Sequence, residues 1–453
     1  MCGIAGVLGT SLDVNSLLDL IAHRGRDGRG VYFDNDIQFG HLRLAIQDVS
    51  DSAAQPMTVD GTTVIYNGEA WNTKELQAEF PDREWKSTSD TEPITALLAR
   101  EGVQALNKID GMFAIAWNNN EGTWIARDRY GKIPLYVGNT QDGLAFASEI
   151  KAFPKGMKVV AVKPGTAIHL QSRRVTNWVV EVKPKDCAPE IVLDLLRDGV
   201  KQRLISDRPV CFLLSGGLDS SLVLALGREL YENPVAYTAV LDPASPDLIA
   251  ARRIATHFDV PLIEVKVPDP TSASIREAVL AVENPMKAQV EIALAHIPLM
   301  KAIASDGYRV ALSGEAADEL FCGYGNMQIA ASRAKSDSDY QDILKASVTK
   351  MSRGNFMRVN KVMMSAGVEG RLPFMEERLV ATALASTKET NPPGKKVLKR
   401  AAEGVLPKWV ISRPKQTFQG GTGITAAVAK ISPSPIRYYN AEATSVFGWL
   451  PKE

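Results

Sequence analysis

The sequence predicts an α+β sandwich of stacked antiparallel sheets with helices, followed by an α/β domain built on a doubly wound parallel sheet. At 453 residues the chain is too long for one compact core, so two domains of ordinary size are expected. The first half contains short strand-like segments separated by turns, which is typical of antiparallel sheets. The second half alternates apolar runs with helical patterns, which is typical of a parallel sheet with crossover helices.

The strand-like segments of the first half are rich in β-branched and aromatic residues, with Gly, Asn or Asp between them. In chain order they are MCGIAGVLG, VYFDN, IQFGHLRLAIQ, TVIYNGE, FAIAWNN, TWIARD, LYVGN and LAFASE. Helical patterns at Asn72 to Phe80 and at Glu92 to Glu101 interrupt this series. The stretch from Lys158 to Val182 is expected to continue in strands.

A linker is expected at Lys183 to Pro189, which contains two prolines and no periodicity. After it, Glu190 to Arg203 has the pattern of an amphipathic helix, and VCFLL has the continuous apolar character of a buried parallel strand. Strand and helix patterns then alternate through SLVLALGRELY, VAYTAVL, LIAARRIATHF, PLIEVKV and YRVALSG, and the chain is mainly helical from Asp318 onward. We therefore predict one domain over residues 1–185 and a second over residues 190–453.

Composition and charge restrict the function classes. The 52 basic and 52 acidic residues cancel, so neither nucleic acid nor an anionic membrane is expected as a partner. The four cysteines and five histidines show neither a disulfide framework nor metal-ligand spacing. No apolar run approaches the roughly 20 residues that span a bilayer, and no signal-peptide pattern is visible. We expect a cytoplasmic protein that handles small molecules.

Cys2 is a candidate nucleophile because only the initiator methionine precedes it. Removal of Met1 would leave a thiol and an α-amine on one residue. An α-amine titrates at about 7.7–8.0, close enough to neutrality to accept the thiol proton. On position alone, a role as a small buried hydrophobe is the more common fate of a cysteine. The motifs that follow Cys2 favour the nucleophile.

Seven motifs occur in order in the first domain: MCGIAGV, HRGRDG, RLAI, YNGE, SDTE, GMFA and ARDRYGKIPLY. Together they resemble the class II glutamine amidotransferases over essentially all of residues 1–155. The resemblance implies an N-terminal-nucleophile sandwich in which Cys2 attacks the carboxamide carbon of glutamine and releases ammonia. It also implies an oxyanion hole formed by the Asn67 side chain and the Gly68 backbone N–H, and such a donor typically contributes about 2.7–4 kcal/mol.

The same resemblance assigns the residues that bind glutamine. Arg43 would hold the α-carboxylate through its two-pronged donor geometry. Asp90 would pair with the α-ammonium, and Glu69 would line the site beside Asn67 and Gly68. Outside the family pattern, an arginine or aspartate is usually a solvated charge, and Asn-Gly is an ordinary hairpin turn.

A second candidate site is the segment SGGLDSS, Ser215 to Ser221, which lies between an apolar strand and a helical pattern. Glycines allow the backbone to approach phosphate, while hydroxyls, N–H groups and the helix N-terminus stabilise its charge. No lysine closes the segment, so it does not match the P-loop. It looks like the pyrophosphate-binding loop of AMP-forming ATP enzymes, in which Asp219 would reach phosphate through Mg2+.

Four segments resemble the asparagine synthetase domain over about Val192 to Gly423: SPDLIAARRIA, SGEAADELFCGY, NKVMMSAGVEGRLPFMEERLV and LP…SRPKQTF. The resemblance implies an α/β pyrophosphate-loop ATPase domain. In it, Glu315 would assist formation of an acyl-adenylate, and Lys415 would steady that intermediate. Mg2+ would be held by Asp219 and Asp318. The residues that would bind ATP are Leu213, Ser215, Gly216, Gly217, Asp219, Ser220, Val240, Ser313, Gly314 and Lys361.

Several positions depart from the family pattern. Arg26 replaces the proline that usually follows HRG, and Cys322 replaces a glycine before Gly323. The chain ends soon after the last motif, without the extension of many family members. The helix before SGEA lacks the arginine that the family usually carries there, and Glu291 falls near its place. Either Lys287 substitutes for this arginine or the acceptor differs from aspartate.

The expected function is ATP-dependent synthesis of asparagine from aspartate with ammonia from glutamine, through β-aspartyl-AMP, giving AMP and pyrophosphate. The expected partners are glutamine, aspartate and MgATP. The sequence leaves open whether the protein forms a homodimer. One alternative is the same amidotransfer on a different carboxylate, as in secondary-metabolite or peptide amidation. The presence of Cys2, Asn67 and Asp90 argues against a β-lactam-forming relative, and that of Asp219 and Glu315 argues against a catalytically silent sensor.

Overall fold

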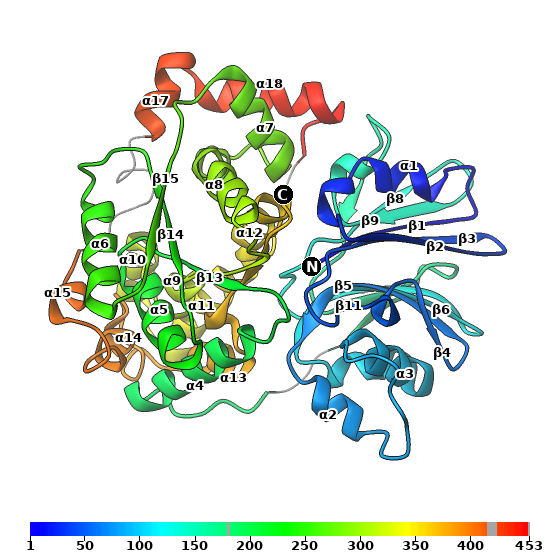
Figure 1. The fold of residues 1–453 in the computed structure, drawn as a ribbon, viewed down its shortest axis with the longest axis horizontal. Helices are drawn as coiled ribbons and strands as arrows, with labels where there is room; N and C mark the ends of the chain where they lie inside the picture. The colour runs from blue at the N-terminus through cyan, green and yellow to red at the C-terminus, as the bar shows by residue number, and fades with distance from the viewer. Residues whose placement is uncertain (179–181, 415–423, 452–453) are drawn as a thin grey trace.

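The computed structural model describes residues 1–178, 182–414 and 424–451, and its first 177 residues hold two six-stranded antiparallel sheets (Figure 1). The first sheet has the order β10-β8-β9-β1-β3-β2, and the second has the order β12-β11-β7-β6-β5-β4. The strands of the first sheet are β1 (Gly3–Leu8), β2 (Gly28–Asp34), β3 (Ile37–Arg43), β8 (Tyr136–Asn139), β9 (Leu144–Ala147) and β10 (Val160–Ala161). Those of the second are β4 (Met57–Val59), β5 (Thr62–Ala70), β6 (Gly111–Asn119), β7 (Gly122–Arg127), β11 (Thr166–His169) and β12 (Val175–Asn177).

Helices cover the outer faces of the two sheets, so the first half has four layers (Figure 1). Helix α1 (Val14–Asp19) packs on β1 and β3, whereas α3 (Thr91–Glu101) packs on β4 and β5 and contacts α2 (Thr73–Ala78). The predicted sandwich is confirmed, and both predicted helices are present. Helix α1 was not predicted, because its six residues show too little periodicity. The predicted strand residues 179–181 lie outside the described residues.

The second half is built on a five-stranded parallel sheet with the order β15-β14-β13-β16-β17. Its strands are β13 (Val210–Leu213), β14 (Ala236–Val240), β15 (Leu262–Lys266), β16 (Val310–Leu312) and β17 (Glu369–Arg371). The chain leaves β13 in one direction and later returns to its other side at β16, so the doubly wound prediction is confirmed. This reversal leaves a crevice at the carboxyl ends of the two central strands.

Strand β17 was not predicted, because two of its three residues are charged and carry no apolar signal. Both charged side chains are nevertheless fully buried. Glu369 forms ion pairs with the N-terminal ammonium of Met1 and with Arg371. The strand is therefore stabilised by charge pairing with a segment that lies far away in the sequence.

Residues 182–188 contain neither helix nor strand, as expected for a linker, and helices then surround the parallel sheet. They are α4 (Pro189–Arg203), α5 (Leu218–Leu230), α6 (Pro246–Phe258), α7 (Ser272–Val282), α8 (Lys287–Ser305), α9 (Ala317–Leu320), α10 (Gly325–Arg333), α11 (Asp337–Met351), α12 (Asn355–Met364), α13 (Glu377–Ala385), α14 (Lys396–Ala401), α15 (Lys408–Ile411), α17 (Ile424–Ile431) and α18 (Pro435–Phe447). The 3-10 helices of the whole chain are η1 (Ala22–Arg24), η2 (Asp51–Ala53), η3 (Gly102–Lys108), η4 (Ile150–Ala152) and η5 (Pro373–Met375). None of the helices in the described ranges has both the length and the apolar character needed to cross a membrane.

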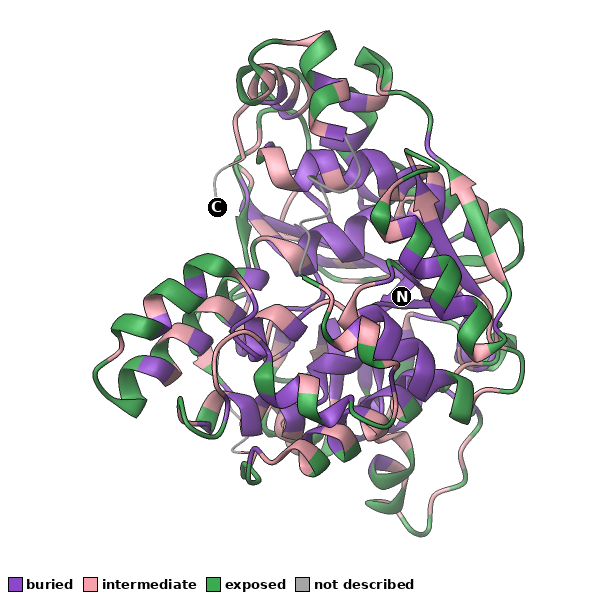
Figure 2. Cartoon of the chain, turned by 90° about the vertical axis from the view of Figure 1, so that its left-hand side faces the viewer, coloured by how far each residue is buried: buried purple, intermediate pink, exposed green. Residues whose placement is uncertain are grey.

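Buried residues gather around the parallel sheet, and exposed residues lie mainly on the outer helices and loops (Figure 2). The interior also crosses between the halves. One apolar cluster joins Val7 and Ile150 of the first half to Ile275 and Val362 of the second. Burial of such side chains contributes roughly 1.5–3 kcal/mol each, so the halves are held together by packing as well as by the linker.

Close packing of α4 gives a test of the second half. A Cβ atom on Gly199 would lie 2.5 Å from the Pro373 carbonyl oxygen, so the backbone would have to shift. Alanine gains about 1 kcal/mol of helix propensity, but such overpacking costs about 1–3 kcal/mol. We expect Gly199→Ala to lower the midpoint of urea unfolding followed by tryptophan fluorescence.

The matched control is Gly325→Ala at the start of α10, where an added Cβ meets nothing within 4 Å. This variant should keep or raise the midpoint. An equal response of the two variants would contradict the close approach of α4 and η5.

Candidate active sites

Cys2 is buried and held by contacts from three separate segments. Its backbone N–H donates to Asn67 Oδ1 at 2.8 Å, and its carbonyl oxygen accepts from Arg24 Nε at 2.9 Å. Its Sγ lies 3.9 Å from the carbonyl oxygen of Leu44, the residue that follows Arg43. Burial raises the pKa of the thiol, so a nearby base is needed to form a thiolate at neutral pH.

Met1 precedes Cys2 in this chain, so the N-terminal amine belongs to Met1. The Met1 ammonium is fully buried and pairs with Glu369 of β17. The Cys2 nitrogen, which is an amide here, already lies against Asn67. Removal of Met1 would place an ionisable amine at this position, next to the thiol of the same residue.

Asn67 and Gly68 lie inside β5, opposite Ala114 and Phe113 of β6, so they do not form a hairpin turn. Asn67 Nδ2 donates to Ser148 Oγ at 3.4 Å, which orients the amide. A Cβ atom on Gly68 would lie 2.3 Å from the Met112 carbonyl oxygen, so glycine is required where the strands meet. Two candidate oxyanion donors therefore sit on a rigid strand beside Cys2.

The predicted glutamine-binding residues surround the same end of β5. Glu69 follows Gly68 on the strand, and Asp90 Oδ2 accepts from the backbone N–H of Ala70 at 2.8 Å. Burial raises the pKa of Asp90 to about 6, and burial also raises the pKa of Glu69. Arg43 ends β3, where its Nη1 donates to the Ser50 carbonyl oxygen at 2.7 Å. The structure thus brings these residues near Cys2 from two strands and a helix start.

A cavity of about 640 Å³ opens at the carboxyl ends of β13, β14 and β16, where the order of the parallel sheet predicts a crevice. The loop after β13 lies at the N-terminus of α5, which favours bound phosphate. The predicted residues that line the cavity are Leu213, Ser215, Gly217, Asp219, Ser220, Ser313, Gly314, Glu315 and Asp318.

Three predicted residues of this site, Gly216, Val240 and Lys361, do not line the cavity, and a fourth lies outside the described residues. Gly216 has a φ of +72°, and a Cβ there would lie 2.6 Å from the Ala251 nitrogen, so it shapes the loop against α6. Val240 is buried between two lining residues, Ala239 and Leu241. Lys415 lies outside the described residues.

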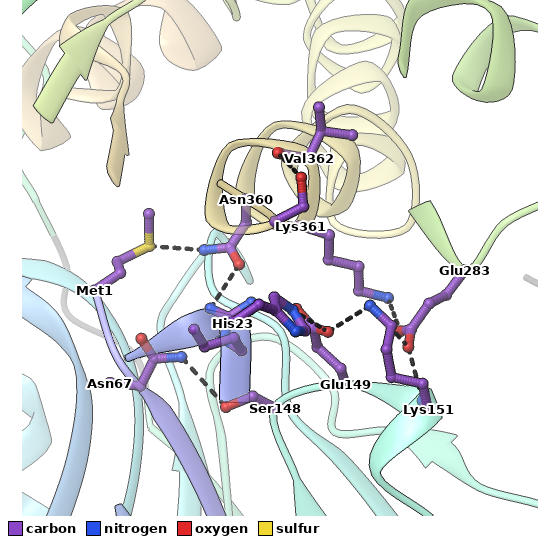
Figure 3. Close-up of polar contacts among 12 residues, drawn as sticks. Met1, His23, Asn67, Ser148, Glu149, Lys151, Glu283, Asn360, Lys361 and Val362 are labelled. Carbon is purple, nitrogen blue, oxygen red and sulfur yellow. Dashed lines mark hydrogen bonds and ion pairs between the residues drawn. The ribbon is translucent and has the colours of Figure 1, made fainter. Parts of the chain in front are cut away.

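Lys361 is placed differently from the prediction. It is 1 % exposed, and its Nζ donates to Glu283 at 2.6 Å and to the Tyr136 hydroxyl at 2.8 Å, at the contact between the halves (Figure 3). With these partners, Lys361 does not line the cavity. The expectation that Lys361 neutralises phosphate is therefore not supported by its position.

Lys395 is a cavity residue that the sequence motifs did not single out. Its ammonium lies 2.6 Å from Asp219 Oδ2 and 2.7 Å from Asp318 Oδ1. Burial opposes the charge, but the two carboxylates raise the pKa of Lys395 above its usual value. A cation thus already sits between the two carboxylates predicted to hold Mg2+. Among the described residues, no group of three or more His, Cys, Asp or Glu side chains could hold a metal ion.

The turn around Cys322 fixes Lys395. Cys322 has a φ of +48°, the left-handed region that the family glycine adopts without strain. Its carbonyl oxygen accepts from Gly394 N at 2.9 Å, and the Phe321 carbonyl oxygen accepts from Lys395 N at 2.9 Å. A Cβ on Gly323 would lie 2.0 Å from Asp318 Oδ1 and 2.4 Å from Lys395 Cε, so only glycine leaves room for this pair. The cysteine departure therefore preserves the turn.

A guanidinium does reach Glu315, but it comes from α12. Arg358 Nη2 donates to Glu315 Oε1 at 2.7 Å, and Arg358 Nε donates to Gln289 Oε1 at 2.9 Å. Glu291 instead is fully buried beside Lys287 and Thr425, and neither Glu291 nor Lys287 lines the cavity. Neither the substitution by Lys287 nor a role for Glu291 at the acceptor is supported.

Comparisons with known proteins match both halves of the chain. A model of the glutamine amidotransferase domain matches residues 1–176, and a model of asparagine synthase matches residues 192–341 and 329–432. Asparagine synthetase B (glutamine-hydrolysing) of Escherichia coli is 30 % identical, over 93 % of this chain and 83 % of its own length. The glutamine-hydrolysing asparagine synthetase 3 of Arabidopsis thaliana is 31 % identical over 93 % and 79 %, respectively.

Solved structures similar to the chain each match part of it. A glutamine phosphoribosylpyrophosphate amidotransferase from B. subtilis has a TM-score of 0.36 and 19 % identity, over 58 % of this chain and 65 % of its own. An ammonia-dependent NAD synthetase from Campylobacter jejuni has a TM-score of 0.29 and 16 % identity, over 58 % and 98 %. The family assignment depends on the sequence matches.

The position of Lys395 predicts a change in metal binding. Lys395→Met would remove the ammonium from between Asp219 and Asp318, which would then repel each other and attract a divalent cation. We expect Mn2+, as a paramagnetic substitute for Mg2+, to bind at least about tenfold more tightly without nucleotide, a gain of about 1.4 kcal/mol. Electron paramagnetic resonance of free Mn2+ measures this directly. Lys399→Met, in the same cavity, is the control and should leave Mn2+ affinity unchanged, and equal affinities in all three proteins would contradict the assignment.

Proposed function

The chain belongs to the family of glutamine-hydrolysing asparagine synthetases, and we propose that it makes asparagine in two half-reactions at the two sites described above. Members of this class are ligases with an amidotransferase domain. We propose a glutaminase domain over residues 1–185 and a synthetase domain over residues 190–453. The observation that carries the proposal is the coexistence of a buried Cys2 beside Asn67 with a cavity that places Glu315 at the end of the parallel sheet.

The first half-reaction would release ammonia from glutamine. After removal of Met1, the Cys2 amine accepts the thiol proton, and Sγ attacks the carboxamide carbon. Asn67 Nδ2 and the Gly68 N–H donate to the oxyanion. The proton passes to the leaving nitrogen, ammonia departs, and water hydrolyses the thioester to glutamate and the free thiol. Asn67 is suited to this role because its Oδ1 already holds the Cys2 nitrogen.

Glutamine would be recognised at its α-carbon groups. The Asp90 carboxylate would accept from the α-ammonium, and Glu69 would line the same end of β5. Arg43 would bind the α-carboxylate as a planar two-pronged donor. Because Arg43 directly precedes Leu44, whose carbonyl contacts Cys2 Sγ, its binding of substrate is linked to the position of the nucleophile.

The second half-reaction would activate the acceptor. The β-carboxylate of aspartate attacks the α-phosphorus of ATP, giving β-aspartyl-AMP and pyrophosphate, and ammonia then displaces AMP to give asparagine. The loop from Ser215 to Ser220 would hold the pyrophosphate at the N-terminus of α5. Asp219 and Asp318 would hold Mg2+, which when bound screens the phosphate charge. Glu315 would assist adenylation, and Lys415 stays a prediction for the intermediate.

The position of Arg358 favours aspartate over the alternative acceptors. The alternative, amidotransfer to a different carboxylate, depended on Glu291 and on the absence of an arginine from the helix before SGEA. Arg358 supplies a buried guanidinium beside Glu315, whereas Glu291 lies outside the cavity. A cation at this place is suited to bind the α-carboxylate of an amino acid. Amidation of a secondary metabolite or peptide is therefore left without a supporting observation.

The function is tested by incubating the protein with glutamine, MgATP and aspartate and quantifying asparagine, glutamate, AMP and pyrophosphate. We expect equal amounts of asparagine, AMP and pyrophosphate. Cys2→Ala should form none from glutamine and regain synthesis with ammonium chloride, because only the first site is lost. Formation of ADP, or glutamate release without asparagine, would reject the proposal.

The raised pKa of Asp90 predicts the pH dependence of glutamine binding. The α-ammonium pairs only with the ionised carboxylate, which predominates above pH about 6. The KM for glutamine should thus be constant above this pH and rise up to tenfold per pH unit below it. Initial-rate measurements of glutamate release from pH 5 to 8 test this.

Asp90→Asn is the control for this titration. It should raise the KM for glutamine about 10- to 100-fold, since a charge-assisted hydrogen bond contributes about 1.5–3 kcal/mol. It should also remove the inflection near pH 6. An inflection that persists in this variant would assign the titration to another group.

A further inference from the structure

Helix α12 (Asn355–Met364) touches both candidate sites. At its first turns, Asn355 Nδ2 donates to Glu319 Oε1 at 3.0 Å and Arg358 Nη2 donates to Glu315 Oε1 at 2.7 Å. Both acidic residues follow β16, and Glu315 lines the cavity. The N-terminal half of this ten-residue helix therefore belongs to the acceptor site.

The next residues of the helix face the glutaminase half. Asn360 Oδ1 accepts from Arg24 Nη2 at 2.9 Å, and Arg24 Nε donates to the Cys2 carbonyl oxygen at 2.9 Å. Two hydrogen bonds through one guanidinium thus join α12 to the nucleophile. Arg24 is fully buried and also donates to Glu149 at 2.5 Å, so it cannot easily change partners.

Lys361 forms a second contact between the halves (Figure 3). Its Nζ donates to the Tyr136 hydroxyl of the first half at 2.8 Å, and to Glu283 Oε2 of its own half at 2.6 Å. The Glu283 carboxylate accepts from the backbone N–H groups of Ile150 and Lys151 in the first half, at 2.9 and 2.7 Å. Glu283 ends α7 with a φ of +58°. A single buried carboxylate therefore connects α12, α7 and the segment after β9.

Stability alone does not explain these buried charges. Desolvation costs several kcal/mol for each ion, and an apolar pair of the same volume is often as stable. The hydrogen bonds that these charged groups make across the two halves do, however, restrict the geometry, because a displacement of one half against the other would leave them unsatisfied in a medium of low dielectric constant. The contacts of Asn360 and Lys361 therefore favour one relative orientation of the two halves over neighbouring ones.

We propose that α12 couples the two active sites, with Asn360 and Lys361 as positioning residues that hold the glutaminase site where its ammonia reaches the acceptor beside Glu315. This inference rests on the proposed function. Ammonia that meets bulk water is protonated and loses its nucleophilic lone pair. A loosened interface would admit water, so glutamine hydrolysis would continue while transfer to the acceptor fails.

The experiment uses the double variant Lys361→Met/Glu283→Gln in the full chain. It removes both charges while keeping similar side-chain volumes, so neither ion is left buried alone. Two quantities are measured: glutamate formed per asparagine with glutamine as donor, and the rate and ATP KM of asparagine synthesis with ammonium chloride. We expect the first to rise about 2- to 30-fold, the range of coupling changes seen for residues between sites. The ammonium-driven rate and ATP KM should stay at wild-type values.

The matched control is Lys301→Met/Glu277→Gln, which makes the same substitutions at an exposed ion pair of 2.7 Å between α8 and α7. It should leave the glutamate-to-asparagine ratio unchanged. Asn360→Ala provides an independent variant, because it breaks the Arg24 contact and keeps the Lys361–Glu283 pair. It should also raise the ratio with little effect on the ammonium-driven rate.

The outcomes separate coupling from other roles. An unchanged ratio in both interface variants would overturn the proposal. A raised KM for ATP in the ammonium-driven reaction, together with an unchanged glutamate-to-asparagine ratio, would also overturn the proposal. That result would support the original prediction that Lys361 binds ATP. Loss of both activities together would show a role in folding only. Failure of the wild type to form asparagine from ammonium would instead reject the proposed function.

Discussion

The guanidinium of Arg24 is the contact on which the relation between the two halves depends. It is fully buried, and its three nitrogen groups donate to the Cys2 carbonyl, to Glu149 and to Asn360. A buried arginine is tolerated only when its donors are satisfied, so these partners must be present together. Cys2, the first sheet and α12 are consequently fixed relative to one another by one side chain.

In the synthetase cavity, as around Arg24, charged side chains lie beside partners of opposite charge. Asp219 and Asp318 approach each other at the end of the parallel sheet, where two carboxylates alone would repel. The ammonium of Lys395 lies between them and offsets this repulsion. Close backbone packing at Gly323 makes room for that ammonium.

Sequence reasoning succeeded where local signals are strong and failed where partners are distant. Apart from β4, which was not predicted, the strands of the two antiparallel sheets follow from periodicity and turn residues, as do α2, α3, α4 and the loop after β13. Strand β17 was missed because its charged residues are buried only through Met1 and Arg371. Lys361 was expected at phosphate from its motif, but a motif does not show which way a helical side chain points. Arg358 carried no signal, because its partner Glu315 lies 43 residues earlier in the chain.

The sequence by itself determined the fold classes, their order along the chain and the family, since these depend on local patterns and on ordered motifs. The tertiary structure decided which charges meet. It placed Lys395 between two aspartates, brought Arg358 to the acceptor site, and moved Lys361 to the contact between the halves. The physical reason is that a buried charge is stabilised only by a partner within a few ångströms, and chain distance gives no information about which partner that is.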